Sequence, residues 1–271
     1  MGWVLTVGMV VLATWASMRW AWWLRTVDWQ HPRILMYHMV RERIPWSRSN
    51  KLRVNRDLFE RQVRWLKETG WTFATVSELV DGRLEGMGKV VALTFDDGYR
   101  DNLLKALPIM QKYGAKMTLY LVADRESHPD WPARRRADRA GSDLSREERL
   151  SNGEVRELLA SGLVELGSHT MTHADLTQIV GEEKKWEIEG SKDRLKELFR
   201  VKVSTFCYPF GLYGEEDVEH ARHADYKAAV TVQEGISDLD REDLMQLKRV
   251  KVSGKEGMFS FRLRIRTGRR S

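Results

Sequence analysis

From residue 28 onwards the chain alternates short apolar runs with longer amphipathic stretches, which is the pattern of an α/β fold. Each apolar run has the length of a buried strand. The stretches between the runs carry apolar residues at helical spacing. One begins after the capping residue Asn55 and ends at Gly70, and another covers about residues 182–199. The predicted strands comprise residues 34–37, 90–95, 117–122, 164–167, 203–208, 227–232 and 247–252.

The first 18 residues differ from this pattern because they contain no charged side chain. As a helix they would extend about 27 Å, close to the thickness of the hydrocarbon core of a bilayer. Tryptophans, which settle at membrane interfaces, flank this run at both ends: Trp3, Trp20, Trp22 and Trp23. We therefore expect residues 1–25 to form a single membrane-anchor helix and residues 26–271 to form one folded domain.

A cleaved signal peptide is the alternative reading of this segment, with Thr14-Trp15-Ala16 as its cleavage site. The segment lacks the basic n-region of a signal peptide, which favours an uncleaved anchor. Its orientation is a separate question. The nearest arginines, Arg19, Arg25 and Arg33, all follow the apolar run, and by the positive-inside rule this places the domain in the cytoplasm.

Composition narrows the choice of partners. The 271 residues fit one large α/β domain, and 42% apolar with 31% charged residues suits a globular body. The net charge of +6 is concentrated in the last ten residues, which suit either solvent or an anionic surface. No recognised nucleic-acid motif accompanies this charge, so no nucleic-acid partner is expected.

The chain has a single cysteine, Cys207, and therefore cannot form an intramolecular disulfide.

Two regions have no clear secondary-structure pattern. Residues 124–150 carry seven acidic and seven arginine side chains, which predicts a solvated excursion with weak structure. Near the carboxyl end, apolar residues alternate with arginines and a serine between residues 259 and 265, and this run fits a last strand or a short helix.

Polar residues follow the predicted strands at the points where those strands end. His38 follows the first strand, the sequence Thr-Phe-Asp-Asp-Gly ends with Asp96, Asp97 and Gly98, and Cys-Tyr-Pro-Phe-Gly begins at Cys207. His169 and His173 follow residues 164–167 at the i, i+4 spacing of a metal pair. Each motif alone is commonly a turn, a rigid loop or an interior histidine. Because the carboxyl ends of parallel strands converge in a barrel, these side chains are expected to meet in one cleft.

The three motifs Thr-Phe-Asp-Asp-Gly, His-x-x-x-His and Tyr-Pro-Phe-Gly resemble those of the polysaccharide deacetylases, also called carbohydrate esterase family 4 or the NodB-homology domain. The resemblance runs from about residue 34 to residue 252. It implies an irregular (β/α)7 barrel. It also implies that Asp97, His169 and His173 bind a divalent metal, most commonly Zn²⁺, with Co²⁺ or Ni²⁺ as alternatives.

The resemblance assigns further roles as well. Asp96 matches the catalytic base, and the backbone N–H of Phe210 matches the donor that stabilises the oxyanion. Zn²⁺ lowers the pKa of water from 15.7 to roughly 7, which supplies hydroxide at neutral pH. His38 is our candidate for the acid that protonates the leaving amine, because one subgroup of the family carries its acid histidine in a Tyr-His segment near the start.

The chain departs from the family pattern at Cys207, where many members have an arginine that orients the catalytic aspartate. Arg249, on a late predicted strand, could replace it. The expected function is removal of N-acetyl groups from a cell-envelope polysaccharide that contains N-acetylglucosamine. Because the commoner substrates of the family lie outside the cytoplasm, we expect the domain there, against the arginine count. The alternatives are a deacylase of a lipid-linked amino sugar at the cytoplasmic membrane face and a catalytically silent carbohydrate-binding barrel. An intact base and metal triad argue against the silent barrel.

Overall fold

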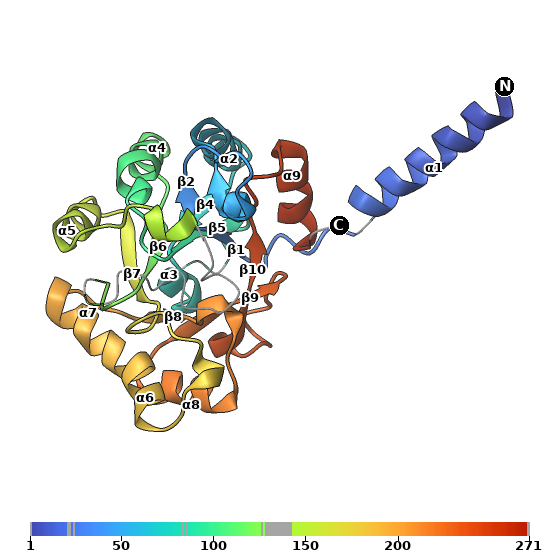
Figure 1. The fold of residues 1–271 in the computed structure, drawn as a ribbon. Helices are drawn as coiled ribbons and strands as arrows, with labels where there is room; N and C mark the ends of the chain where they lie inside the picture. Colours follow the sequence, from blue (N-terminus) through green and yellow to red (C-terminus); the bar gives the residue numbers. More distant parts are fainter. Residues whose placement is uncertain are drawn as a thin grey trace.

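A computed structural model describes residues 2–20, 23, 25–82, 84, 86–125, 127 and 143–269. Within them, seven parallel strands close into a barrel, and helices cover its outside (Figure 1). The ring closes where β1 pairs with β5 over five residues, from Arg33 with Val91 to Tyr37 with Phe95. The barrel strands are β1 (Arg33–Tyr37), β5 (Val90–Asp96), β6 (Met117–Leu121), β7 (Val164–Ser168), β8 (Thr205–Cys207), β9 (Ala228–Glu234) and β10 (Leu247–Lys251).

Each of these strands overlaps a strand predicted from the sequence, and the expectation of a seven-stranded α/β barrel is confirmed. The short strand β4 (Thr72–Ala74) was not predicted. It pairs with the first residues of β5, Val90 to Ala92, and β6 pairs with the following residues of β5, Leu93 to Asp96. A second, two-stranded sheet joins β2 (Met39–Val40) to β3 (Arg53–Val54).

The helices begin where the sequence provides capping groups. Asn55 accepts hydrogen bonds from the first backbone N–H groups of α2, and Ser151 with Glu154 forms the capping box of α5. The α-helices are α1 (Gly2–Trp20), α2 (Arg56–Glu68), α3 (Val76–Val80), α4 (Leu107–Tyr113), α5 (Asn152–Ala160), α6 (Glu182–Lys185), α7 (Ser191–Phe199), α8 (Glu215–His223) and α9 (Met258–Thr267). Shorter helical turns are η1 (Arg48–Leu52), η2 (Asn102–Ala106), η4 (Asp143–Arg146), η5 (Leu176–Gln178), η6 (Trp186–Gly190), η7 (Pro209–Gly211) and η8 (Leu244–Gln246).

Side chains alternate between the inside and the outside of the barrel, as the two-residue period of a strand requires. On β5, Val91, Leu93 and Phe95 pack outwards against the helices, whereas Val90 and Ala92 belong to a separate, smaller interior cluster. The same alternation places the last residues of the strands inside the mouth of the barrel. It therefore decides which side chains can reach a common site.

The charged segment before α5 is better ordered at its end than its composition predicted. Residues 128–142 lie outside the described residues. Glu147 is buried, and its carboxylate accepts two hydrogen bonds from the Arg53 guanidinium, at 2.7 and 3.1 Å, and also pairs with Arg41. This ion network joins the end of the segment to β3, so at least this part is not a solvated excursion. The ambiguous run near the carboxyl end forms the helix α9.

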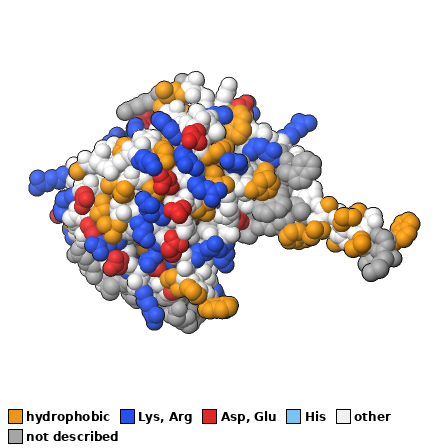
Figure 2. Space-filling view, turned by 90° about the horizontal axis from the view of Figure 1, so that it is seen from above, with side chains coloured by type: hydrophobic (Ala, Val, Ile, Leu, Met, Phe, Trp, Pro, Cys, Tyr) orange, Lys and Arg blue, Asp and Glu red, His pale blue; other side chains and the backbone are white. Residues whose placement is uncertain are grey.

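Helix α1 projects from the barrel in Figure 1, and Figure 2 shows its apolar side chains in solvent. No helix among the described residues has the length and apolar content needed to cross a membrane. The prediction of a single-pass membrane-anchor helix is therefore wrong. It rested on the absence of charge over residues 1–18, but Thr6, Thr14 and Ser17 interrupt the apolar run and reduce its hydropathy.

Candidate active site

A cavity of about 520 Å³ opens at the carboxyl ends of the barrel strands. All six residues that the sequence singled out for chemistry line it: His38, Asp96, Asp97, His169, His173 and Phe210. The most widely separated of them are 172 positions apart, and the parallel barrel brings them together because each follows or ends a strand.

Asp97, His169 and His173 form a compact, buried group of donor atoms. The Oδ1 atom of Asp97 lies 3.3 Å from Nε2 of His169 and 3.4 Å from Nε2 of His173. Ligands on a tetrahedral ion with bonds of about 2.05 Å stand about 3.3 Å apart, so this spacing fits a bound Zn²⁺. Burial raises the pKa of Asp97, but the two histidines beside its carboxylate outweigh that effect and hold the pKa well below its usual value.

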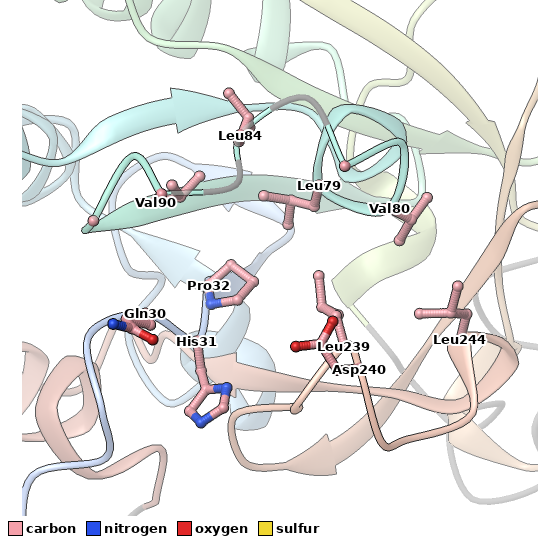
Figure 3. Close-up of a pocket in the computed structure, with 13 residues that line it drawn as sticks. Gln30, His31, Pro32, Leu79, Val80, Leu84, Val90, Leu239, Asp240 and Leu244 are labelled. Atoms are coloured by element: carbon pink, nitrogen blue, oxygen red, sulfur yellow. The ribbon is translucent and has the colours of Figure 1, made fainter.

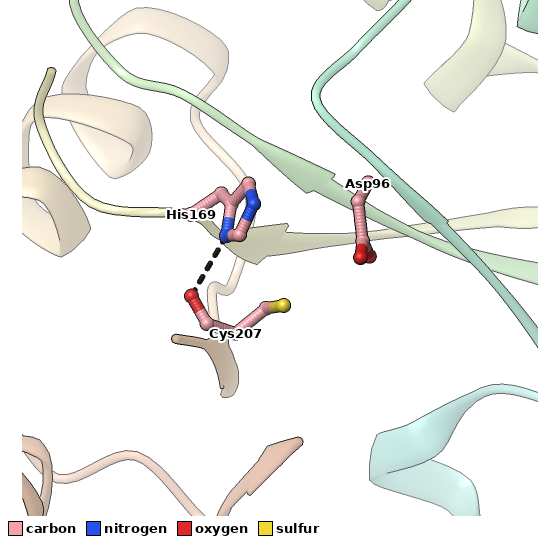
Figure 4. Close-up of side chains that lie close together, drawn as sticks. All are labelled: Asp96, His169 and Cys207. Atoms are coloured by element: carbon pink, nitrogen blue, oxygen red, sulfur yellow. Dashed lines mark hydrogen bonds between the residues drawn. The ribbon is translucent and has the colours of Figure 1, made fainter. Parts of the chain in front are cut away.

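The orientation of His169 also fits a cation. Its Nδ1 lies 2.7 Å from the carbonyl oxygen of Cys207, which can only accept, so Nδ1 carries the proton (Figure 4). In a neutral ring the Nε2 lone pair then points at the carboxylate of Asp97, and two acceptors face each other. A metal ion between them removes that conflict, and the carbonyl holds the ring in the metal-binding tautomer.

Strained backbone is concentrated at this site. Four non-glycine residues in the cavity wall or next to it have positive φ angles: Asp97 at 77°, Thr170 at 68°, His173 at 60° and Phe210 at 58°. Such conformations each cost of the order of 1–3 kcal/mol and persist where the surroundings enforce them. Gly98 of the same motif also has a positive φ angle, 74°. A Cβ atom at this position would in addition lie 2.4 Å from Cδ1 of Leu121.

Asp96 is held by an arginine from the opposite end of the sequence. Nη1 and Nη2 of Arg249 donate to its two carboxylate oxygens at 2.7 and 2.9 Å, and both side chains are buried. Burial raises the pKa of Asp96, but the charge of Arg249 outweighs it and keeps that pKa below the ordinary value. Arg249 itself is fixed by the hydroxyl of Thr94 at 3.0 Å and the carbonyl of Thr231 at 2.7 Å. The base candidate is therefore ionised and immobile.

A second group of potential ligands, Asp96, His169 and Cys207, also lies close together (Figure 4). Arg249 argues against a metal ion there. Its guanidinium already occupies both carboxylate oxygens of Asp96, and its Nη2 lies 3.3 Å from the sulfur of Cys207. A cation at that point would be repelled by a buried positive charge, so the triad of Asp97, His169 and His173 is the better candidate.

His38 lies at the mouth of the barrel beside Asp96. Its Nε2 is 3.9 Å from Oδ2 of Asp96, and its side chain is 16% exposed, so it can reach both the carboxylate and a molecule in the cavity. The backbone carbonyl of His38 accepts a hydrogen bond of 2.9 Å from the side chain of Asn102. This contact holds the backbone of His38 in place and leaves its imidazole ring available to the cavity.

No sequence motif indicated the residues that support His173. Thr172 donates from both its backbone N–H and its hydroxyl to the carboxylate of Glu187, and the backbone N–H of His173 donates to the Thr170 hydroxyl at 2.9 Å. The ring of Phe210 packs edge-on against His173 with 4.5 Å between centroids. Glu187 lies in a charged helical stretch, where one more glutamate is inconspicuous.

A second cavity, of about 380 Å³, lies at the other end of the barrel (Figure 3). Its wall comes from the segment before β1, from α3 and from the loops before β5 and η8. Among the described residues, its ionisable side chains are His31 and Asp240, and no group of metal ligands lines it. The candidate catalytic residues therefore lie at the carboxyl end of the strands.

Known proteins with related sequences include polysaccharide deacetylases. The YxkH protein of Bacillus subtilis strain 168, whose name assigns it to the polysaccharide deacetylases, is 28% identical over 234 residues, which cover 85% of this chain and 75% of that protein. The poly-beta-1,6-N-acetyl-D-glucosamine N-deacetylase of Escherichia coli K12 is 23% identical over 265 residues, and the match covers 86% of this chain and 38% of that protein.

Solved structures agree with the sequence comparison. The deacetylase PplD of Streptococcus pyogenes, solved in complex with acetate, superposes with a TM-score of 0.70 at 28% identity and covers 86% of this chain and 95% of its own. The sequence model of the family described as polysaccharide deacetylase matches residues 84–229, more than half of the chain, and includes the strands that carry Asp96, Asp97, His169 and Cys207. The chain therefore belongs to the polysaccharide deacetylase family.

Proposed function

We propose that the chain is a metal-dependent hydrolase that removes N-acetyl groups from a polysaccharide containing N-acetylglucosamine, of the peptidoglycan or exopolysaccharide type found in cell envelopes. One observation carries this proposal: the immobilised carboxylate of Asp96 lies beside a buried donor triad with tetrahedral spacing. The similarity to the Escherichia coli N-deacetylase supports the choice of sugar. A binding module would need neither the base nor the triad.

Asp97, His169 and His173 would hold the metal, for which Zn²⁺ is our first choice and Co²⁺ or Ni²⁺ are alternatives. When bound, such an ion acts as a Lewis acid that activates water and polarises a carbonyl group. The chain's own contribution is to orient these three side chains before substrate arrives. The carbonyl of Cys207 and the hydroxyl of Thr170 do this for the two histidine segments.

The remaining steps use the residues around the triad. Asp96 accepts a proton from water as the water oxygen bonds to the acetamide carbon. Negative charge develops on the carbonyl oxygen, and the backbone N–H of Phe210 is our candidate donor to it. The carbon–nitrogen bond then breaks, and His38 donates a proton to the departing nitrogen. The products are acetate and a free amino sugar, and one water molecule is consumed for each amide bond that is broken.

The direct experiment is acetate release from N-acetylglucosamine oligomers by the purified full-length chain supplied with Zn²⁺. One acetate should appear for each primary amine formed, because each hydrolysed amide yields both. An oligomer that stays fully acetylated while the metal-loaded protein remains folded would contradict the proposal.

Replacing His38 with alanine tests its role as the acid. The loss of kcat/KM should be larger on an N-acetylglucosamine oligomer than on an aryl acetate, because a phenolate leaves without a proton and an amine does not. The quantity to measure is the ratio of the two losses, which we expect to be well above one. Equal losses on both substrates would mean that His38 positions the substrate and that another group is the acid.

A further inference from the structure

The catalytic cavity has a basic side that the proposed chemistry does not use. Arg48 and Lys51 come from η1, and Lys251 comes from the end of β10; all three line the same cavity as the metal triad. Lys251 is two residues beyond Arg249 on its strand, so its side chain shares the inward face one layer closer to the mouth. We refer to Arg48, Lys51 and Lys251 as the basic rim.

The basic rim is assembled by close backbone packing between distant segments. The N–H of Gly254 donates to the carbonyl of Lys51 at 3.0 Å, and a Cβ atom on Gly254 would lie 1.7 Å from the carbonyl oxygen of Arg53. No other residue type fits this approach. The loop after β10 is therefore held directly against η1, and the two lysines belong to one fixed wall.

The charges of the basic rim are not balanced inside the protein. None of its three side chains forms an ion pair with a carboxylate of the described residues. Neighbouring arginines are paired: Arg53 binds Asp143 and Glu147, and Arg264 binds Glu234 and Glu256. Glu234, the remaining acidic residue of this part of the wall, shares Arg264 with Glu256, so four cations (the three of the rim and Arg264) stand against these two carboxylates and the rim presents excess positive charge to the cavity.

The position of the basic rim indicates which part of a substrate it meets. The rim lies next to β1 and β10, where His38 also enters; Asp97 follows the neighbouring strand β5, which pairs with β1, and His169 follows β7. The triad, His38 and the rim line one cavity, so a sugar whose acetyl group lies at the triad is within the same cavity as the three cations. A neutral glycan gains little from three cations there, and its deacetylated amine would be repelled by them.

We propose that the substrate sugar, or the residue next to it in the glycan, carries an anionic group, a carboxylate or a phosphate, that the basic rim binds. This inference rests on the proposed deacetylase function and narrows its substrate class. The cations would act on binding and on the orientation of the sugar, because among the described residues none of the three forms an ion pair with Asp96 or Asp97.

The test compares acetate release by the full-length chain from three glycans of equal length: a neutral N-acetylglucosamine oligomer, one that alternates with N-acetylmuramic acid and so carries carboxylates, and one that carries phosphate groups. We expect kcat/KM to be about tenfold higher on one of the anionic glycans, and the preferred one identifies the anion. Higher salt should reduce that preference, since exposed charges are screened.

The double variant Lys51→Gln, Lys251→Gln should reduce the preference by about tenfold. Lys255→Gln is the matched control, because Lys255 is exposed on the adjacent loop and lies outside the cavity lining; its preference should equal that of the wild type. Equal rates on all three glycans, or an unchanged preference in the double variant, would overturn the anionic assignment while leaving the deacetylase intact. Failure to release acetate from any glycan would overturn both.

Discussion

Replacing Asp96 with asparagine is expected to lower kcat on an N-acetylglucosamine oligomer by about 10²–10⁴-fold, the usual contribution of a general base. Asparagine keeps the size of the side chain but cannot accept the proton of water. The metal should remain bound, because Asp97 and both histidines are unchanged. The Asp96→Asn variant should therefore show the lower kcat while its metal site is fully occupied.

The measurement combines metal analysis with single-turnover acetate release. Glu242→Gln provides a control for loss of a carboxylate as such, since Glu242 pairs with Lys248 away from the cavity lining. Wild-type turnover in the Asp96→Asn variant would show that another group accepts the proton. Loss of metal from this variant would instead assign Asp96 to the ligand set.

Replacing Arg249 with methionine should affect both folding and chemistry. It leaves the carboxylate of Asp96 buried without its partner, which costs about 3–5 kcal/mol of unfolding free energy when one half of a buried pair is removed. It also removes the charge that lowers the pKa of Asp96, so that burial, which raises this pKa, prevails. The base must be ionised, and the acid limb of kcat/KM should therefore move to higher pH.

The pH profile separates a positioning role from a merely structural one. Arg249→Lys keeps the positive charge but loses the paired hydrogen bonds, so its acid limb should stay nearer to that of the wild type while kcat falls. Thermal denaturation of both variants measures the cost in stability. An acid limb that does not move in Arg249→Met would contradict the electrostatic part of this account.

Much of the fold could be predicted because strands in a covered parallel barrel are nearly continuous apolar runs. The strand β4 has only three residues, Thr72–Ala74, too few for such a pattern. The prediction of a membrane anchor failed for a different reason. A run without charges is not the same as a run with enough apolar content, and no described helix meets that requirement.

The candidate site was predictable where residues follow strands. Asp96, Asp97, His169 and His173 share one cavity because chain direction places strand ends together. The contact between Arg249 and Asp96 was only a conjecture from sequence, because it depends on which face of β10 is inward and on the reach of a long side chain. The basic rim was not foreseen, since a lysine in a short helical turn or at the end of a strand is an ordinary surface residue unless packing turns it towards a cavity.

We propose that Asp97, His169 and His173 hold the metal that this hydrolase needs. The most direct test strips the full-length chain with a chelator and measures acetate release from an N-acetylglucosamine oligomer as Zn²⁺ is added back. We predict no release from the stripped protein, recovery that saturates at one equivalent of Zn²⁺, and no recovery in a folded His169→Ala variant. Full activity in the stripped wild type, or normal recovery in His169→Ala, would contradict the claim.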